Sequence, residues 1–268
     1  MLWYGECSLH VSNGRIKGGL VAFKMWRGSV GIIKPTRRIG SMEQFCKLLP
    51  DGIGVLPMYL DIREGKIDEF ERTLGLYEEL IGELVEAGVD LIHPEGAPVF
   101  MVQGFEGERA TVKRWEKEFG LPVVTAPMTQ VEAMKALGIR RVAGISYFSG
   151  EINKTFARYF QDAGIEVAAM AGMEVPFNRV QWLSSREVYA FARDTFLGAE
   201  GADGIYLLGS GWDVLDMVEM LECDMGVPVV HAMTARIWAI QHRLHVREKI
   251  KGYGRLLAEL PSLVSASS

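Results

Sequence analysis

The chain has 268 residues, of which 49% are hydrophobic and 24% are charged, and its formal net charge at pH 7 is −5. This length allows one large domain or two small ones, each with a sizeable core. The negative charge and the lack of a basic stripe argue against nucleic acid as the main partner. No apolar run approaches the ~20 residues that a membrane-spanning helix needs.

The three cysteines, Cys7, Cys46 and Cys223, show neither the spacing of metal ligands nor an even count. They indicate a reducing compartment, and residues 1–10 lack the basic and apolar segments of a secretory signal. We therefore expect a cytoplasmic protein without a metal site. Cys46 and Cys223 fall in stretches of helical pattern, where a buried and inert thiol is the usual case.

Residues 1–28 differ from the rest of the chain. The pair Asn13-Gly14 lies between apolar segments, and this pattern predicts a β-ribbon with a tight turn. Such a ribbon covers the edge of a sheet, forms an oligomer contact or folds as a flap over a site. The short basic group from Lys34 to Arg38, a little further on, is expected to be a solvated loop.

From residue 29 onward, short β-branched runs bounded by glycine or proline alternate with stretches of helical periodicity. Strands are expected over 29–34, 53–60, 89–92, 122–125, 140–146, 166–170, 204–208 and 227–231. Helices are expected over 42–49, 67–87, 106–119, 129–137, 150–163, 185–197, 214–224 and 235–244, with loops over 94–104 and 179–182. This alternation predicts α/β architecture with parallel sheets covered on both faces, where ligands bind at the carboxyl ends of strands.

One segment occurs twice. Residues 120–126 (GLPVVTA) and 226–232 (GVPVVHA) have the same form, 106 positions apart (226 − 120). Upstream of each copy, a short strand pattern runs into a loop of small residues, 96–98 in the first half and 209–211 in the second. The repeat predicts two similar, pseudo-symmetric α/β units that face each other across a cleft. The units span 29–125, with 232–268 packing back on it, and 126–231, after the N-terminal ribbon over 1–28.

Several motifs in these loops occur in the order of a known family. They are GAPVFMVQG at 96–104, LGIRRVA at 137–143, Tyr147 followed by Asn153, Leu215-Asp216, GVPVV at 226–230 and GYGRL at 252–256. With them the chain resembles the aspartate/glutamate racemase superfamily over roughly residues 29–257, closest to its arylmalonate decarboxylase and maleate isomerase branch. The resemblance implies a cofactor-independent enzyme that acts on the carbon alpha to a carboxylate.

The departures from that family concern its two active-site cysteines. Racemases and isomerases of the superfamily use one cysteine in each loop, and the decarboxylase keeps only the second, as proton donor. Here Gly96 and Gly209 stand at the two positions. Racemisation with an acid/base on each face of the substrate and isomerisation through a cysteine adduct are therefore disfavoured.

Three other side chains are candidates for the proton chemistry. Tyr147 matches a family tyrosine that contacts the substrate carboxylate, and its phenol can donate a hydrogen bond or a proton. His231 ends the last expected strand and titrates near neutrality, so it suits an acid/base facing the cleft. Glu95 precedes the first glycine and is a candidate acid/base if it is desolvated.

The expected substrate contacts come from the strand-end loops. Backbone N–H groups at such loops bind a carboxylate or a developing enolate oxygen; Ala97, Ser210 and Gly211 supply them, whereas Pro98 has none to offer. The full set of expected substrate-binding residues is Pro35, Thr36, Gly96, Ala97, Pro98, Gly209, Ser210 and Gly211.

The sequence leaves several functions open. The first is a decarboxylase or related lyase that acts on a small carboxylic acid through an enediolate without a cysteine. The second is a non-catalytic protein that binds a small carboxylate and has lost both cysteines. Maleate isomerase-like or racemase activity by a non-cysteine mechanism, and a lyase or hydrolase of a related 1,3-dicarbonyl, also remain. A homo-oligomer is possible under each hypothesis.

Overall fold

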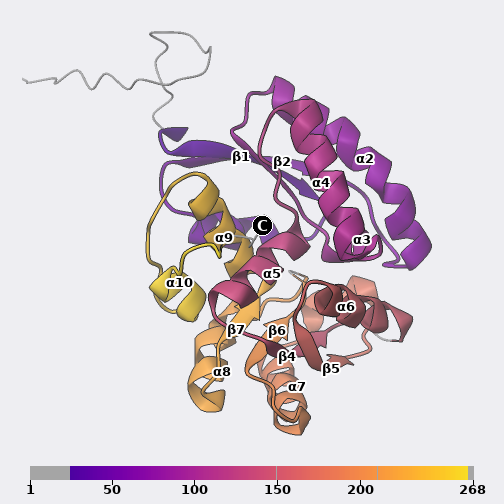
Figure 1. Ribbon diagram of the computed structural model, residues 1–268, viewed down its shortest axis with the longest axis vertical. Helices are drawn as coiled ribbons and strands as arrows, with labels where there is room; N and C mark the ends of the chain where they lie inside the picture. Colours follow the sequence, from indigo (N-terminus) through magenta and orange to yellow (C-terminus); the bar gives the residue numbers. More distant parts are fainter. Residues whose placement is uncertain (1–24, 149, 210, 265–268) are drawn as a thin grey trace, which may run out of the picture.

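The computed structural model describes residues 25–148, 150–209 and 211–264, and it divides into two halves that each contain one parallel sheet (Figure 1). This arrangement confirms the predicted α/β class with two parallel sheets. Most of the expected ribbon over 1–28 lies outside the described residues. Among the described residues, no helix combines the length and the apolar character needed for a bilayer crossing.

The first sheet has the strand order β2-β1-β3, and all of its strands are parallel. The strands are β1 (Gly28–Lys34), β2 (Ile53–Tyr59) and β3 (Leu91–Pro94). The helices of this half are α1 (Ser41–Leu48), α2 (Ile67–Glu86), α3 (Ala97–Met101) and α4 (Gly104–Phe119). Strand β1 is buried almost throughout because it is the middle strand of the three.

The second sheet has the order β5-β4-β6-β7 and is also parallel. Its strands are β4 (Arg141–Ser146), β5 (Glu166–Gly172), β6 (Gly204–Leu207) and β7 (Val229–His231). Around it lie α6 (Glu151–Asp162), α7 (Ser185–Gly198), α8 (Val218–Met225) and two 3-10 helices, η2 (Phe177–Trp182) and η3 (Leu215–Met217).

Two helices join the halves. Helix α5 (Ala126–Ala136) follows the first copy of the repeated segment, α9 (Ala232–Arg243) follows the second, and the two pack against each other between the sheets (Figure 1). Both begin at the same position of the repeat: the side chains of Thr125 and His231 accept the N–H groups of Met128 and Met233. The chain then continues into α10 (Arg255–Glu259), which packs on α9.

Three local expectations are wrong. The strand expected over 122–125 forms only one bridge, between Ile92 and Val123, because the chain turns at Thr125 to cap α5. The loop over 94–104 contains the short helix α3 and the start of α4. The loop over 179–182 lies within η2.

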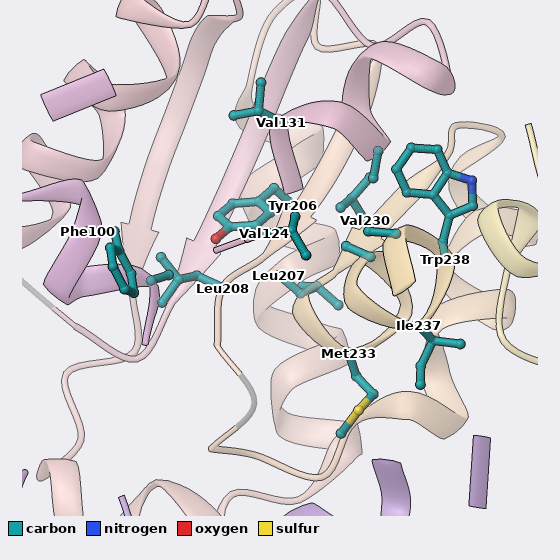
Figure 2. Packing of buried hydrophobic residues seen from close by; sticks show 14 of the residues in the cluster. Phe100, Val124, Val131, Tyr206, Leu207, Leu208, Val230, Met233, Ile237 and Trp238 are labelled. Carbon is teal, nitrogen blue, oxygen red and sulfur yellow. The ribbon is translucent and has the colours of Figure 1, made fainter. Parts of the chain in front are cut away.

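The hydrophobic core is continuous across the two halves. Figure 2 shows Phe100 of α3 and Val131 of α5 near Tyr206 and Leu208 at the end of β6, with Trp238 of α9 on the other side. All five of these side chains are buried. Burial of this apolar surface is the main stabilising contribution, and it fixes how the halves meet.

One buried carboxylate lies in this junction. Glu108 of α4 is fully buried and accepts hydrogen bonds from the hydroxyls of Thr125, at the N-terminus of α5, and Tyr159 of α6. Burial raises the pKa of Glu108 to about 7, although the two hydroxyls favour its charged form. No salt bridge involves it among the residues that the structure describes. No local sequence pattern indicated this group.

The raised pKa predicts how Glu108→Gln changes stability with pH. The folded protein binds the carboxyl proton of Glu108 more tightly than the unfolded chain does. The contribution of Glu108 to the free energy of unfolding is therefore complete below its usual pKa of 4.5 and is lost as the pH rises through about 7. Relative to wild type, E108Q should therefore gain stability between pH 5 and pH 8, on the order of 2 kcal/mol. Urea unfolding across this range measures the difference, and parallel pH profiles would contradict it.

Candidate active site

A cavity of about 70 Å³ lies between the two halves, at the carboxyl ends of strands from both sheets. One water molecule needs roughly 10–15 Å³ of such volume. The cavity therefore has room for about five groups of that size, which is comparable to a small dicarboxylic acid. The residues that line it are Lys34, Pro35, Thr36, Arg38, Ser41, Ile62, Phe70, His93, Glu95, Gly96, Ala97, Pro98, Val99, Ala126, Gln130, Tyr147, Phe148, Phe177, Gly209, Gly211, Ala232 and Arg236.

Most of the residues expected from the sequence meet in this cavity. Tyr147, Glu95 and the expected substrate-binding residues Pro35, Thr36, Gly96, Ala97, Pro98, Gly209 and Gly211 all line it. Ser210 is outside the described residues. His231 is not among the lining residues: its Nδ1 accepts the N–H of Met233 at 3.2 Å and caps α9. Burial and the nearby Arg236 lower the pKa of His231 to about 3, so it is neutral at pH 7.

A buried group of three charged residues forms one wall, and two of them, Lys34 and Arg236, were not among the site residues expected from the sequence. The Nζ of Lys34, the last residue of β1, lies 3.1 Å from Oε2 of Glu95, which follows β3. Arg236 of α9 pairs with Oε1 of the same carboxylate. All three side chains are only 3–5% exposed. The expectation that Lys34 lies in a solvated loop is wrong, because its strand is central in the sheet.

The charges in this group determine one another's ionisation. Burial alone would raise the pKa of Glu95, but Arg236 and Lys34 together lower it to about 2. Burial lowers the pKa of Lys34, the Glu95 carboxylate opposes that shift, and Arg236 adds to it. Glu95 is therefore a permanent carboxylate at neutral pH, which does not suit the expected acid/base role.

A third cation reaches the cavity from the loop after β1. The guanidinium of Arg38 donates a hydrogen bond to the backbone oxygen of Phe177 at 2.9 Å. Its central carbon lies 4.5 Å from the centre of the Phe177 ring. It therefore crosses from the first half to the second. With Lys34, Arg38 and Arg236 against the single carboxylate of Glu95, the lining carries a net charge of +2 (3 − 1). The chain as a whole carries −5.

Gly96 and Gly209, which are expected at the family's cysteine positions, each face a tyrosine hydroxyl. Both have positive φ, +101° at Gly96 and +92° at Gly209. A Cβ at Gly96 would lie 2.9 Å from the hydroxyl of Tyr77, and a Cβ at Gly209 would collide with the hydroxyl of Tyr147. The two phenols thus occupy space into which side chains at these positions would project.

The two tyrosines differ in their surroundings. Tyr77 of α2 is fully buried, donates to the backbone oxygen of Glu95 at 2.6 Å and does not line the cavity. Tyr147 follows β4, lines the cavity and packs edge-on against Trp212. Burial raises the pKa of Tyr147, and Arg38 partly offsets this shift. Tyr147 is therefore a protonated phenol at neutral pH.

Neither described cysteine lines the cavity, although Cys46 lies near enough to Arg236 to act on the pKa of its guanidinium. Cys46 of α1 and Cys223 of α8 are exposed, so the expectation that they are buried is wrong; Cys7 lies outside the described residues. Across 25–148, 150–209 and 211–264, no cluster of three or more His, Cys, Asp or Glu side chains is arranged to hold a metal ion.

Comparison with known proteins identifies the family. The model of the arylmalonate decarboxylase family matches residues 31–257, so the chain belongs to this family and the resemblance found in the sequence is confirmed. The arylmalonate decarboxylase of Bordetella bronchiseptica is 26% identical over 182 residues, which cover 66% of this chain and 74% of that protein. A maleate isomerase of Pseudomonas putida is 26% identical over 184 residues, covering 66% and 72%.

A solved structure shares the fold over most of its length. A variant of the maleate isomerase Iso from Pseudomonas putida, crystallised with maleate, superimposes with a TM-score of 0.78 at 20% identity. The match covers 86% of this chain and 97% of that chain. These relatives support an enzyme of the aspartate/glutamate racemase type.

The position of Tyr147 predicts the effect of Gly209→Cys. The new side chain would collide with the phenol and would hold a non-glycine residue at φ +92°. Backbone strain of about 1–3 kcal/mol and overpacking of about 1–3 kcal/mol should destabilise G209C. Tyr147→Ala removes the collision, so the double variant should be more stable than the sum of the single effects implies. Additive effects in a double-mutant cycle of urea unfolding would contradict this account.

Proposed function

We propose that this member of the arylmalonate decarboxylase family is a cofactor-independent lyase that decarboxylates a small dicarboxylic acid through an enediolate. The observation that carries the proposal is the buried cavity between the halves, with its net charge of +2 and its single protonated phenol. The relatives' names fit this chemistry, since arylmalonate and maleate are both dicarboxylates.

The charge of the cavity favours a dianion. Lys34, Arg38 and Arg236 all line it, and Glu95 neutralises only one of the three. Charge interactions are stronger in a buried site than in water, and guanidinium groups bind carboxylates through paired hydrogen bonds. A substrate with two carboxylates would balance the two positive charges that Glu95 does not neutralise.

In the proposed reaction, negative charge develops on oxygen atoms that lie in the positively charged cavity. The bond between the alpha carbon and one carboxylate breaks, CO₂ departs, and the electron pair is delocalised onto the remaining carboxylate as an enediolate. The backbone N–H group of Ala97, at the N-terminus of α3, together with the cations, stabilises those oxygens. Apolar side chains of the same lining, including Val99 and Phe148, suit the uncharged CO₂ that departs, and the other product keeps one carboxylate.

Tyr147 is the group that supplies the proton. Of the three candidates from the sequence, Glu95 is held ionised by its two cations, and His231 caps α9 and is not among the lining residues. The phenol of Tyr147 lies beside Gly209, at the position of the family's second cysteine, and it keeps its proton at neutral pH. Arg38 lies 5.9 Å from the ring centre and stabilises the phenolate that forms when the alpha carbon is protonated.

The second candidate function is a carboxylate-binding protein without catalysis. Glycine at both cysteine positions favours it, because the cavity and its charge are kept while the family's usual acid/base groups are lost. Isomerase or racemase activity without cysteine is the third candidate. It needs a proton acceptor on each face of the substrate or a nucleophile, a requirement that Tyr147 alone does not meet.

Turnover in deuterated buffer tests the proposal. Substituted malonates, maleate and amino-acid enantiomers are followed by NMR, and the lyase should release CO₂ from a malonate and place deuterium on the alpha carbon. Tyr147→Phe should lower kcat/KM by about 10²–10⁴-fold, the usual contribution of a general acid, with little change in Tm. The matched control is Tyr77→Phe, which removes the buried hydrogen bond to the backbone of Glu95; it should lower Tm and reduce kcat/KM far less than Y147F, because Tyr77 does not line the cavity.

Three results would overturn the proposal. Full turnover in Y147F would exclude Tyr147 as the proton donor. Isomerised maleate or an exchanged amino acid would favour the third candidate. No turnover across the panel, together with a higher Tm in the presence of one carboxylate, would favour the binding protein.

A further inference from the structure

Apart from Oε1 of Glu95, which forms an ion pair with Arg236, two buried polar atoms in the cavity lining lack a hydrogen-bond partner among the described residues. They are Nε2 of His93, on β3, and Nε2 of Gln130, on α5. His93 is fully buried, Gln130 is 1% exposed, and both side chains line the cavity. A buried polar atom without a partner is destabilising, so a ligand that pairs with both atoms gains affinity.

His93 presents an acceptor. Its Nδ1 lies 2.7 Å from the backbone oxygen of Val124. Because a carbonyl oxygen only accepts, Nδ1 carries the hydrogen and Nε2 keeps a lone pair. Burial, opposed by Glu95 and reinforced by Arg236, lowers the pKa of His93 to about 4. The ring is therefore neutral at pH 7, and Nε2 accepts a hydrogen bond there.

Gln130 presents a donor. Its Oε1 accepts the hydroxyl hydrogen of Tyr206 at 2.5 Å. Burial raises the pKa of Tyr206 well above its usual value, so the phenol keeps the hydrogen that it donates. That bond fixes the orientation of the amide, and its NH₂ group remains to donate to a ligand.

His93 and Gln130 line the same small cavity and are connected through one short segment of the chain. The carbonyl of Val124 that binds His93 comes just before Thr125, the residue that caps α5, and Gln130 lies on the first turns of that helix. The cavity that both side chains line encloses only about 70 Å³. A single small group in this part of the cavity can therefore contact both.

A hydroxyl is the group that satisfies both atoms, because it accepts from the amide and donates to the imidazole. A carboxylate or a carbonyl oxygen satisfies only Gln130, and a methyl group satisfies neither. An ammonium group can donate to His93, but it has no acceptor for Gln130 and is repelled by Arg236.

We propose that His93 and Gln130 form a hydroxyl-binding subsite and that the preferred ligands are small dicarboxylic acids that carry a hydroxyl group. The placement of the carboxylates beside Lys34 and Arg236 rests on the proposed function. The hydroxyl subsite rests on the two unpaired atoms.

Calorimetric titration of matched acids tests this subsite. Malonate is compared with hydroxymalonate, and succinate with malate, at pH 7.5 on the full-length protein. The hydroxy acid of at least one pair should bind roughly 10-fold or more tightly, as expected for two buried hydrogen bonds. Gln130→Met removes the donor and His93→Phe removes the acceptor, so each should reduce the ratio of the two affinities towards one.

The control is Gln241→Met. Gln241 of α9 is also fully buried with an unpartnered Nε2, but it does not line the cavity. Q241M should keep the wild-type ratio, which separates the subsite from a general effect of replacing a buried glutamine. Equal affinities within both pairs, or a preference that survives both Q130M and H93F, would overturn the subsite alone. Absence of binding by all four acids would overturn the carboxylate pocket as well.

Discussion

The carboxylate of Glu95 is the constraint on which the site depends. It follows the strand at one edge of the first sheet and holds Lys34 from the central strand and Arg236 from the helix after the last strand. Buried charges are tolerated only when they are paired, so this carboxylate allows two cations to stay in the interior. Arg38 adds a third cation, so the one carboxylate of Glu95 leaves two positive charges of the cavity lining without an anionic partner in that lining. The protein thus keeps a positive cavity within an acidic chain, and an anionic ligand completes the balance.

The repeat in the sequence explains where that cavity lies and why its two sides differ. Each copy ends in a cap for a joining helix, and the two helices pack together between the sheets. Each half also places a tyrosine hydroxyl beside a glycine with positive φ. The hydroxyl of Tyr77 donates to the backbone oxygen of Glu95, whereas Tyr147 lines the cavity. The two halves therefore place one phenol outside the cavity and one in its lining.

Strand-end loops were predictable from the sequence, because parallel strands bring their carboxyl ends to one edge and glycine and proline mark those ends. The roles of Lys34 and Arg236 could not be predicted in this way. Their partner Glu95 lies far from both in the sequence, and only the folded structure brings the three side chains together. The hydroxyls of Thr125 and Tyr159 around Glu108 were missed for the same reason. His231 was expected to face the cleft because it ends a strand, but its ring caps the next helix. Local pattern identified the positions of loops and left the direction of individual side chains undetermined.

The account rests on a cavity whose charge favours dianions, and comparative binding tests this most directly. The affinities of malonate and propionate, which differ by one carboxylate, are measured by calorimetry at two ionic strengths. We expect malonate to bind at least 10-fold more tightly at low salt and the advantage to persist at 0.5 M salt, because buried charges are screened little. Equal affinities for the two acids, or an advantage that disappears with added salt, would contradict the claim that the buried Lys34 and Arg236, with the partly buried Arg38, form a site for a dicarboxylate.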